Sequence, residues 1–230
     1  MQGYIPQTCM YYLQRGIRRT GIYWLYDHNG HLYQAFCDFT SEPYMSAWTL
    51  VMSWATTKYR NMPNFKSKAF YEDAPVNEAL PSWEIYRQTL ARMTTIRKQS
   101  IHWRATCDFQ LRAGKAIIYK DYIRGKFSEF DIMLPKSVGP SKCQRVEYIN
   151  ILGNAGGSGT TVGFWQHNGN FFLHTDSHNT GCEFTPPPYK KLPRVDYFGY
   201  YGDGLNPEFT CSRNASSTTQ WWFGGYLGEQ

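Results

Sequence analysis

Two histidines flank an aspartate in the stretch His174-Thr-Asp-Ser-His178, a spacing that could bind a transition metal. Side chains alternate along a strand, so His174 and His178 would share a face, with Asp176 between them. Imidazole nitrogens and a carboxylate oxygen are ligands that Zn²⁺ accepts, but tetrahedral coordination needs a fourth ligand. The sequence offers no fourth ligand in an obvious place. The alternative is that these are ordinary loop histidines that bind no metal.

The chain carries none of the common signatures of catalysis. It has no Gly-x-Ser-x-Gly nucleophile motif, no His-Glu-x-x-His motif and no close carboxylate pair within an apolar run. The Gly-rich segment 153–161 lacks the lysine with which a P-loop reaches phosphates, so we expect a surface loop between strands there. These observations predict a protein that is not an enzyme.

Six cysteines are the remaining reactive groups, and their spacing indicates disulfides. No two of them form a C-x-x-C pair, which argues against a compact zinc knuckle. An even number of widely spaced cysteines is typical of an oxidising compartment, so we expect a secreted, extracellular protein. The glycosylation sequon Asn214-Ala-Ser216 agrees with secretion. Sequence alone leaves about 15 pairings open. The cysteines are Cys9, Cys37, Cys107, Cys143, Cys182 and Cys211.

Length and composition indicate one ordered domain with many turns. The chain has 230 residues, of which 17% are aromatic and only 18% are charged, whereas disordered chains are poor in aromatic residues. No apolar run approaches the roughly 18 residues of a membrane span. The N-terminus lacks the apolar core of a signal peptide, so we expect either a mature protein or one segment of a longer one.

Positive charge is concentrated in residues 87–126. This segment holds ten of the 24 basic residues and two of the 18 acidic ones, although the net charge of the chain is only +6. A basic surface could bind acidic glycans or acidic extracellular proteins, whereas nucleic acid is not an expected partner. The alternative is that these side chains form an ordinary solvated face.

Aromatic-rich segments predict strands over residues 21–26, 31–39 and 48–54. The first two are joined by Asp27-His-Asn-Gly30, an Asn-Gly hairpin signal. Period-two patterns predict a half-buried strand over 101–109. Further strands are expected over 116–123, 129–134, 146–152, 162–166 and 170–174, and 55–80 is expected to be a long loop.

One amphipathic helix is predicted over residues 83–98, with Ser82 as its N-cap. Apolar residues recur there every three or four positions, which is the period of a helix. These residues are Trp83, Tyr86, Leu90, Met93 and Ile96.

Four short motifs near the N-terminus resemble the opening of a fibrinogen C-terminal-like domain. They are Cys9, Gly21-Ile-Tyr23, Cys37-Asp38 and Trp48-Thr49. A second group is similar to fibrinogen-related extracellular proteins of cnidarians, among them skeletal organic matrix proteins of stony corals. That group consists of 102–107, 181–183, 198–201 and 219–225.

The resemblance implies an α+β, fibrinogen-like domain in which an antiparallel sheet is flanked by a helix and long disulfide-tied loops. It implies one domain over 1–230, with N-terminal strands in 1–54, a helix and central sheet in 55–152, and a loop-rich recognition part in 153–230. It also implies a Cys9–Cys37 disulfide. For the other four cysteines we expect neighbours to pair, as Cys107–Cys143 and Cys182–Cys211.

Fibrinogen-like domains usually bind Ca²⁺ through an acidic loop that follows a His-Asn-Gly strand. Here His167-Asn-Gly169 is followed by Asp176-Ser-His-Asn-Thr180, which keeps one carboxylate. Calcium takes six to eight oxygen ligands. If Ca²⁺ is a cofactor, the resemblance places Asp176, Asn179 and Asp203 at its site.

The same resemblance implies a recognition function, with glycans or extracellular proteins as partners, a second copy of the chain among them. Flat aromatic rings suit the C–H faces of sugars, so aromatic residues near the polar loops are the candidate ligand platform, although core packing is the alternative. These residues are Tyr197, Tyr200, Tyr201, Trp221, Trp222 and Tyr226. The alternative function is a structural component of an extracellular matrix or assembly that binds no small ligand.

Overall fold

The computed structural model describes residues 5–41, 44–111, 119–134, 142–167, 169–178, 181–187, 196–202 and 204–229. The strands of this part form a large sheet of nine strands and a small one of three, and all pairings between named strands are antiparallel. The large sheet has the order β1-β2-β3-β12-β5-β6-β8-β9, with β4 also paired to β3. Its strands are β1 Gly21–Tyr26, β2 Leu32–Ser41, β3 Met45–Ala55, β4 Ile85–Arg87, β5 His102–Cys107, β6 Tyr122–Lys126, β8 Tyr148–Ile151, β9 Asn154–Gly156 and β12 Thr218–Tyr226. The small sheet has the order β11-β10-β7, from β7 Lys142–Arg145, β10 Thr161–His167 and β11 Phe171–Thr175.

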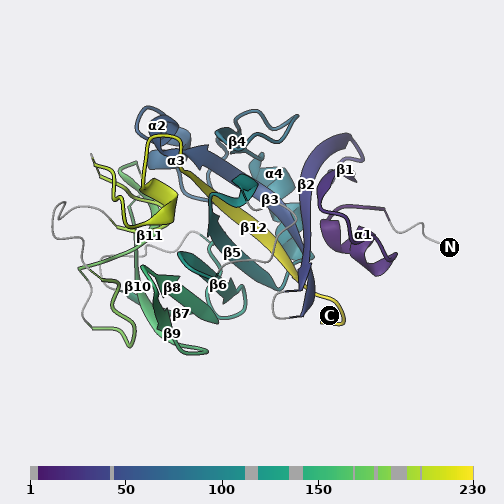
Figure 1. Ribbon diagram of the computed structural model, residues 1–230. Coiled ribbons are helices and arrows are strands. Elements are labelled where there is room, and N and C mark those ends of the chain that lie inside the picture. The colour runs from purple at the N-terminus through teal and green to yellow at the C-terminus, as the bar shows by residue number, and fades with distance from the viewer. Residues whose placement is uncertain are drawn as a thin grey trace.

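The C-terminal strand β12 lies in the middle of the large sheet, between β3 and β5 (Figure 1). All of its residues are buried. Trp221 and Trp222 belong to two different hydrophobic clusters, because adjacent side chains on a strand point to opposite faces. Gly224 permits the close approach to β3, since a Cβ at this position would lie 2.0 Å from the carbonyl oxygen of Ala47.

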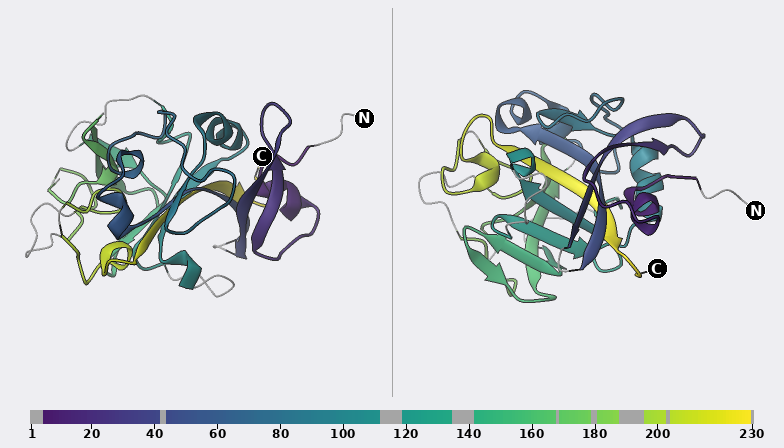
Figure 2. Two further views of the ribbon diagram at one scale, coloured as in Figure 1. Left: turned by 90° about the horizontal axis from the view of Figure 1, so that it is seen from above. Right: turned by 45° about the vertical axis from the view of Figure 1, so that its right-hand side comes forward.

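The N-terminal hairpin confirms the local turn chemistry. Gly30 has a φ of +80°, the left-handed conformation that the Asn-Gly turn requires. Helix α1 (Cys9–Gln14) lies against this hairpin at one end of the molecule, and the described chain starts and ends there (Figure 2). The strands β7 to β11 lie at the opposite end (Figures 1 and 2).

The predicted helix over 83–98 is only half right. Helix α4 spans Leu90–Lys98, and its N-cap is Thr89, whose Oγ1 accepts the Arg92 N–H at 3.2 Å, so Ser82 is not the cap. Residues 85–87 form the short strand β4 instead. The spacing of Trp83 and Tyr86 fits a helix, but pairing with β3 decides for a strand.

Other elements also differ from prediction. Residues 129–134 form turns rather than a strand, and the loop over 55–80 contains the short helices α2 (Thr56–Tyr59) and α3 (Pro63–Lys66). The first part of the predicted strand over 116–123 lies outside the described residues, and β6 begins at Tyr122.

Strand β5 is buried on both faces rather than one. Its polar face is covered by an aromatic cluster that includes Trp48, Phe109 and Trp222. Arg104 lies in this cluster, 4.5 Å from the ring of Trp48, and forms a buried ion pair with Asp38 (Nη2 to Oδ2, 2.5 Å). A strand buried on both faces can carry polar residues only where they are paired.

Only part of the positive charge in 87–126 lies at the surface. Arg87 and Arg104 are fully buried, and Arg124 is 8% exposed. Arg112 and Lys115 lie outside the described residues. Three of the ten basic residues of the expected binding face are therefore buried and cannot contact a partner.

Three disulfides are present, and one of the three predicted pairings is right. Cys9–Cys37 joins α1 to β2, as the resemblance implied. The other two are Cys107–Cys211 and Cys143–Cys182, so the expectation that neighbouring cysteines pair is wrong for them. The antiparallel sheet with a few helices makes the chain an α+β protein.

Candidate functional site

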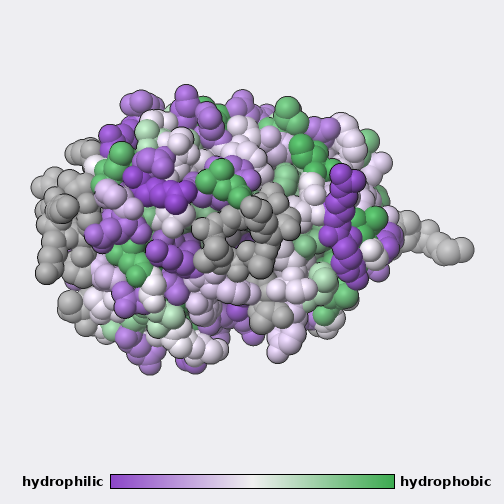
Figure 3. Space-filling model, viewed as in Figure 1, coloured by the Kyte–Doolittle hydropathy of each residue, from purple (hydrophilic) through white to green (hydrophobic). Residues whose placement is uncertain are grey.

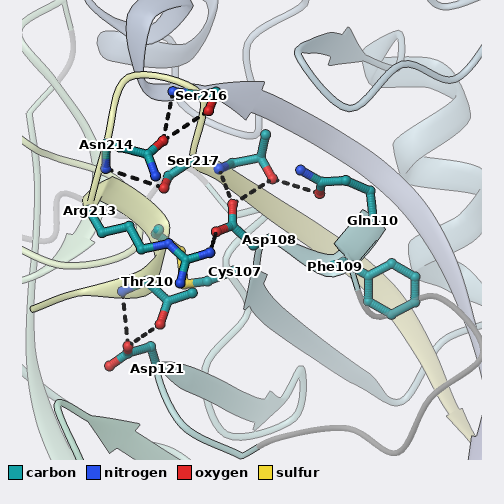
Figure 4. Close-up of polar contacts among 12 residues, drawn as sticks. Cys107, Asp108, Phe109, Gln110, Asp121, Thr210, Arg213, Asn214, Ser216 and Ser217 are labelled. Atoms are coloured by element: carbon teal, nitrogen blue, oxygen red, sulfur yellow. Dashed lines mark hydrogen bonds and ion pairs between the residues drawn. A yellow bond between two sulfur atoms is a disulfide. The ribbon is translucent and has the colours of Figure 1, made fainter. Parts of the chain in front are cut away.

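A groove of about 550 Å³ lies where three distant segments meet. One segment precedes β4, the second follows β5, and the third leads into β12. Figure 4 shows residues of the second and third segments. The lining residues come from 81–84, from 108–111 and from 213–218. Ligand cavities commonly have volumes of about 300 to 1,000 Å³, so this groove could hold a small ligand.

Two of the groove segments are joined near their start by the Cys107–Cys211 disulfide. Cys107 ends β5, and Cys211 lies in the 3₁₀ helix η2 (Thr210–Ser212). Asp121 holds the start of η2, because its Oδ2 accepts the N–H and the hydroxyl of Thr210 at 2.9 and 2.6 Å (Figure 4). The segment after Cys211 is therefore fixed at its origin by a covalent bond and two hydrogen bonds.

Asp108 organises the middle of the groove (Figure 4). It is 2% exposed and has a φ of +49°, which aspartate adopts more readily than most residues. Its Oδ1 accepts the N–H of Thr218 at 2.7 Å, and its Oδ2 lies 2.9 Å from Nη2 of Arg213. Burial raises the pKa of Asp108, and the hydrogen bonds from Thr218 and the charge of Arg213 oppose that rise. Asp108 thus ties the strand β12 to the groove wall that carries Arg213.

A chain of side-chain hydrogen bonds extends this arrangement into the sheet. The hydroxyl of Thr218 donates to Oε1 of Gln110 at 2.8 Å and accepts from Nε2 of Gln220 at 2.7 Å. The Oε1 of Gln220 in turn accepts the backbone N–H of Phe109 at 3.1 Å. Because these partners lie on β12 and on the 3₁₀ helix η1 (Phe109–Leu111), the polar groups of the groove are held in fixed positions.

The opposite wall is held by the aromatic cluster. Trp83 is half-buried, and its ring lies 4.8 Å from that of Phe36 and 5.8 Å from that of Phe109. Its backbone oxygen accepts the hydroxyl of Ser53 at 2.6 Å. Next to it, Glu84 is exposed. This wall combines an aromatic ring and an exposed carboxylate on a fixed backbone.

The glycosylation sequon lies on the rim of this groove. Asn214 and Ser216 are exposed, and Oδ1 of Asn214 accepts both the N–H and the hydroxyl of Ser216, at 3.0 and 2.9 Å (Figure 4). A glycan on Asn214 stays a prediction, and its attachment point would be at the mouth of the groove.

The aromatic residues expected to form a ligand platform are core residues, which corrects that expectation. Tyr197, Tyr201, Trp221 and Trp222 are fully buried, and Tyr226 is 6% exposed, so their rings present no face to a sugar. The indole N–H of Trp221 donates to the carbonyl of Phe198, which is typical of a packed tryptophan. Only Tyr200 is partly exposed, and its ring lies 5.3 Å from that of His174.

The expected calcium ligands are only partly described. Asn179 and Asp203 lie outside the described residues, whereas Asp176 is 4% exposed, at the end of β11. Its described neighbours are His178 and Asp196, and ligand atoms of these three lie within 4.8 Å of one another. Calcium prefers six to eight oxygen ligands, and the described side chains offer two carboxylates with imidazoles. This donor set does not fit a calcium site.

Sequence reasoning did not select Asp108, Arg213 or Asp196. Nothing in the local pattern marks them, because the first two meet through the pairing of β5 with β12. Asp196 reaches Asp176 through an isolated antiparallel bridge between Thr175 and Tyr197.

Comparisons with known proteins add no functional information. No protein-family model matches the chain, and a search of curated proteins finds no significant match. No helix in the described parts of the chain combines the length and the apolar character that a bilayer crossing requires.

Proposed function

We propose that this chain is a non-catalytic, extracellular recognition domain of the fibrinogen-related class, and that it binds a glycan in the groove between 81–84, 108–111 and 213–218. The observation that carries the proposal is the lining of this groove. It places hydrogen-bonding side chains and one aromatic ring on segments that are fixed by a disulfide and by buried hydrogen bonds.

A sugar matches this lining better than an apolar ligand does. Sugar hydroxyls need donors and acceptors, which Arg213, Glu84 and Ser216 supply, and the C–H face of a sugar can lie against Trp83. On the face of the molecule in Figure 3, the coloured hydrophobic residues are scattered among hydrophilic ones. Such a face suits a polar ligand more than a large apolar partner.

The test is binding of the purified chain to a glycan array, with protein from a host that does not attach N-glycans. We expect selective binding that Arg213→Gln and Glu84→Gln each weaken by about tenfold, equal to about 1.4 kcal/mol. The matched control is Arg60→Gln, since Arg60 is an exposed arginine outside the groove lining. Thermal melts check that each variant is folded.

Two results would contradict the groove proposal. One is that the wild type binds no glycan on the array. The other is that both groove variants bind as tightly as the Arg60→Gln control. If Asn214 is glycosylated in a eukaryotic host, we expect that form to bind more weakly, because the attached glycan would occupy the rim.

A second candidate function, assembly into an extracellular structure, is favoured by the exposed face of the N-terminal hairpin. Ile22 and Trp24 on β1 and Leu32 on β2 are 49%, 52% and 52% exposed. The register pairs Tyr26 with Leu32 and Trp24 with Gln34, which places the three apolar side chains on one face. Strand β1 is also an edge of the sheet, where another chain can associate.

If this face mediates assembly, light scattering is expected to show concentration-dependent self-association that Trp24→Lys abolishes. The matched control is Leu80→Lys, which changes a residue of similar exposure (55%) outside the hairpin. A wild-type chain that stays monomeric at high concentration would rule out self-assembly through this face, as would equal association of the two variants.

A further inference from the structure

Four potential ligands gather at the end of β11. His174 belongs to β11, and Asp176 directly follows it. His178 lies in the next turn, and Asp196 comes from a segment 18 positions after His178. The bridge between Thr175 and Tyr197, with hydrogen bonds of 3.0 and 3.3 Å, sets Asp196 opposite Asp176. His174, Asp176 and Asp196 are buried, whereas the side chain of His178 is 63% exposed.

One ring nitrogen of His174 faces Asp196 and has no hydrogen-bond partner among the described residues. Its Nδ1 lies 2.7 Å from the carbonyl oxygen of Phe172, which can only accept, so Nδ1 carries the proton. In the neutral ring, Nε2 then has a lone pair. This atom is buried, makes no hydrogen bond to any residue that the structure describes, and lies 3.5 Å from Oδ2 of Asp196. The Nε2 lone pair of His174 and the Oδ2 atom of Asp196 are both acceptors, so a cation between them would be favourable in the interior.

A proton on Nε2 of His174 is the simplest such cation, but the geometry argues against it. The separation of 3.5 Å between Nε2 and Oδ2 of Asp196 is long for a hydrogen bond of a charged pair, which is usually about 2.7 to 2.9 Å.

Both carboxylates are already oriented by hydrogen bonds to one oxygen. Oδ1 of Asp196 accepts the N–H and the hydroxyl of Ser177 at 2.8 and 2.7 Å. Oδ1 of Asp176 accepts the N–H of His178 at 2.8 Å. Outer hydrogen bonds of this kind are typical of metal-binding carboxylates, because they fix the orientation of the ligand. In the described part of the chain, the ion-pair partners of these two aspartates are histidines.

We propose that Asp176, His178 and Asp196, with Nε2 of His174 as the fourth ligand, bind a divalent transition metal of the Zn²⁺ class. Zinc bonds of about 2.0 to 2.1 Å place tetrahedral ligand atoms roughly 3.4 Å apart. The separations here are 3.5 Å from His174 Nε2 to Asp196 Oδ2 and 3.7 Å from His178 Nδ1 to Asp176 Oδ1. Ligand atoms of Asp176, His178 and Asp196 lie within 4.8 Å of one another, and His174 adjoins this group through Asp196, so the side chains must move to bring all four ligands onto one ion. Two imidazoles select zinc over calcium, although the resemblance placed calcium in this loop.

The bound ion would be structural, since it would join the end of β11 to the segment around Asp196. A ligand that binds only the folded state raises the stability of that state. The site stands independently of the groove, and the inference does not rest on glycan binding.

The test uses the full chain after dialysis against a chelator. Titration calorimetry with ZnCl₂ is expected to give one ion per chain, and a thermal melt is expected to shift upward with zinc and not with millimolar calcium. Cobalt(II) in place of zinc is expected to give the strong visible absorption of a tetrahedral site.

The decisive variant is His178→Ala, because this exposed side chain can be removed without a cavity in the core. We expect it to weaken zinc binding by at least about 100-fold, beyond the usual effect of an outer-sphere change. The matched control, His28→Ala, removes an exposed histidine on the N-terminal hairpin turn and should bind zinc as the wild type does. Asp196→Asn tests the buried carboxylate.

Three outcomes would overturn the proposal. They are a wild-type chain that binds no zinc in the micromolar range, equal zinc affinity of His178→Ala and His28→Ala, and stabilisation by calcium in place of zinc.

Discussion

Replacing Arg87 by lysine is expected to lower the free energy of unfolding by about 3 to 5 kcal/mol, because several buried carbonyls lose their donor at a cost of about 1 to 3 kcal/mol each. Arg87 is fully buried on β4, and its guanidinium donates to backbone carbonyls in 64–72. Nη1 reaches Asn64 and Lys68, and Nη2 reaches Ala69 and Glu72 at 2.6 and 2.8 Å. Lysine has no planar fork and cannot reach carbonyls on several sides at once.

Urea denaturation at neutral pH is the measurement, and Arg60→Lys is the matched control because Arg60 is exposed. Burial lowers the pKa of Arg87 to about 10, which still leaves the side chain charged at neutral pH. The hydrogen bonds therefore have to compensate for a buried cation. A loss below about 1 kcal/mol, within the range of an ordinary surface change, would contradict this account.

Replacing both Cys107 and Cys211 by alanine is expected to cost about 5 kcal/mol of stability on the chain-entropy model for a loop of this length. The bond spans 104 positions, and both sulfurs lie in the interior, at the base of the groove. The bond also positions η2 and the segment 213–218 that lines the groove, so its removal should disturb the groove. Glycan binding should therefore fall together with stability.

Removing Cys143 and Cys182 is the matched comparison. This bond spans 39 positions, which the same model converts to about 4 kcal/mol, and Cys143 is exposed on β7. We expect mild reductant to open it first, since an exposed disulfide is easier to attack. Peptide mapping without reduction checks the pairings directly. Fragments that join Cys107 to Cys143 would refute the arrangement described here.

Local signals in the sequence were sufficient for the N-terminal hairpin and for most central strands. The Asn-Gly turn before Leu32 fixes the backbone with a glycine at positive φ, and no distant residue is needed for that. The Cys9–Cys37 bond was predicted in a different way, from a family resemblance, and the pairing of β1 with β2 accommodates it.

Where a sequence pattern fits two structures, the tertiary contacts determine which one forms. The spacing of Trp83 and Tyr86 fits a helix, yet Arg87 on this segment pairs with Met52 of β3 and donates to the loop over 64–72. A helix there would leave these carbonyls without that donor. Arg104 likewise looks like a surface residue in sequence, and only the aromatic rings that cover β5 make it a buried partner of Asp38.

The sequence by itself determined a disulfide-bonded, aromatic-rich antiparallel protein, because turn residues and alternation act over a few positions. The tertiary structure alone decided the remaining cysteine pairs, the groove and the position of Asp196 beside the His174–His178 stretch. Each depends on strands that are far apart in the chain: β12 lies beside β5 and so brings Arg213 to Asp108, and the bridge at Thr175 brings Asp196 to Asp176. Long-range pairing is set by the sum of core packing over the whole sheet, which no short motif encodes.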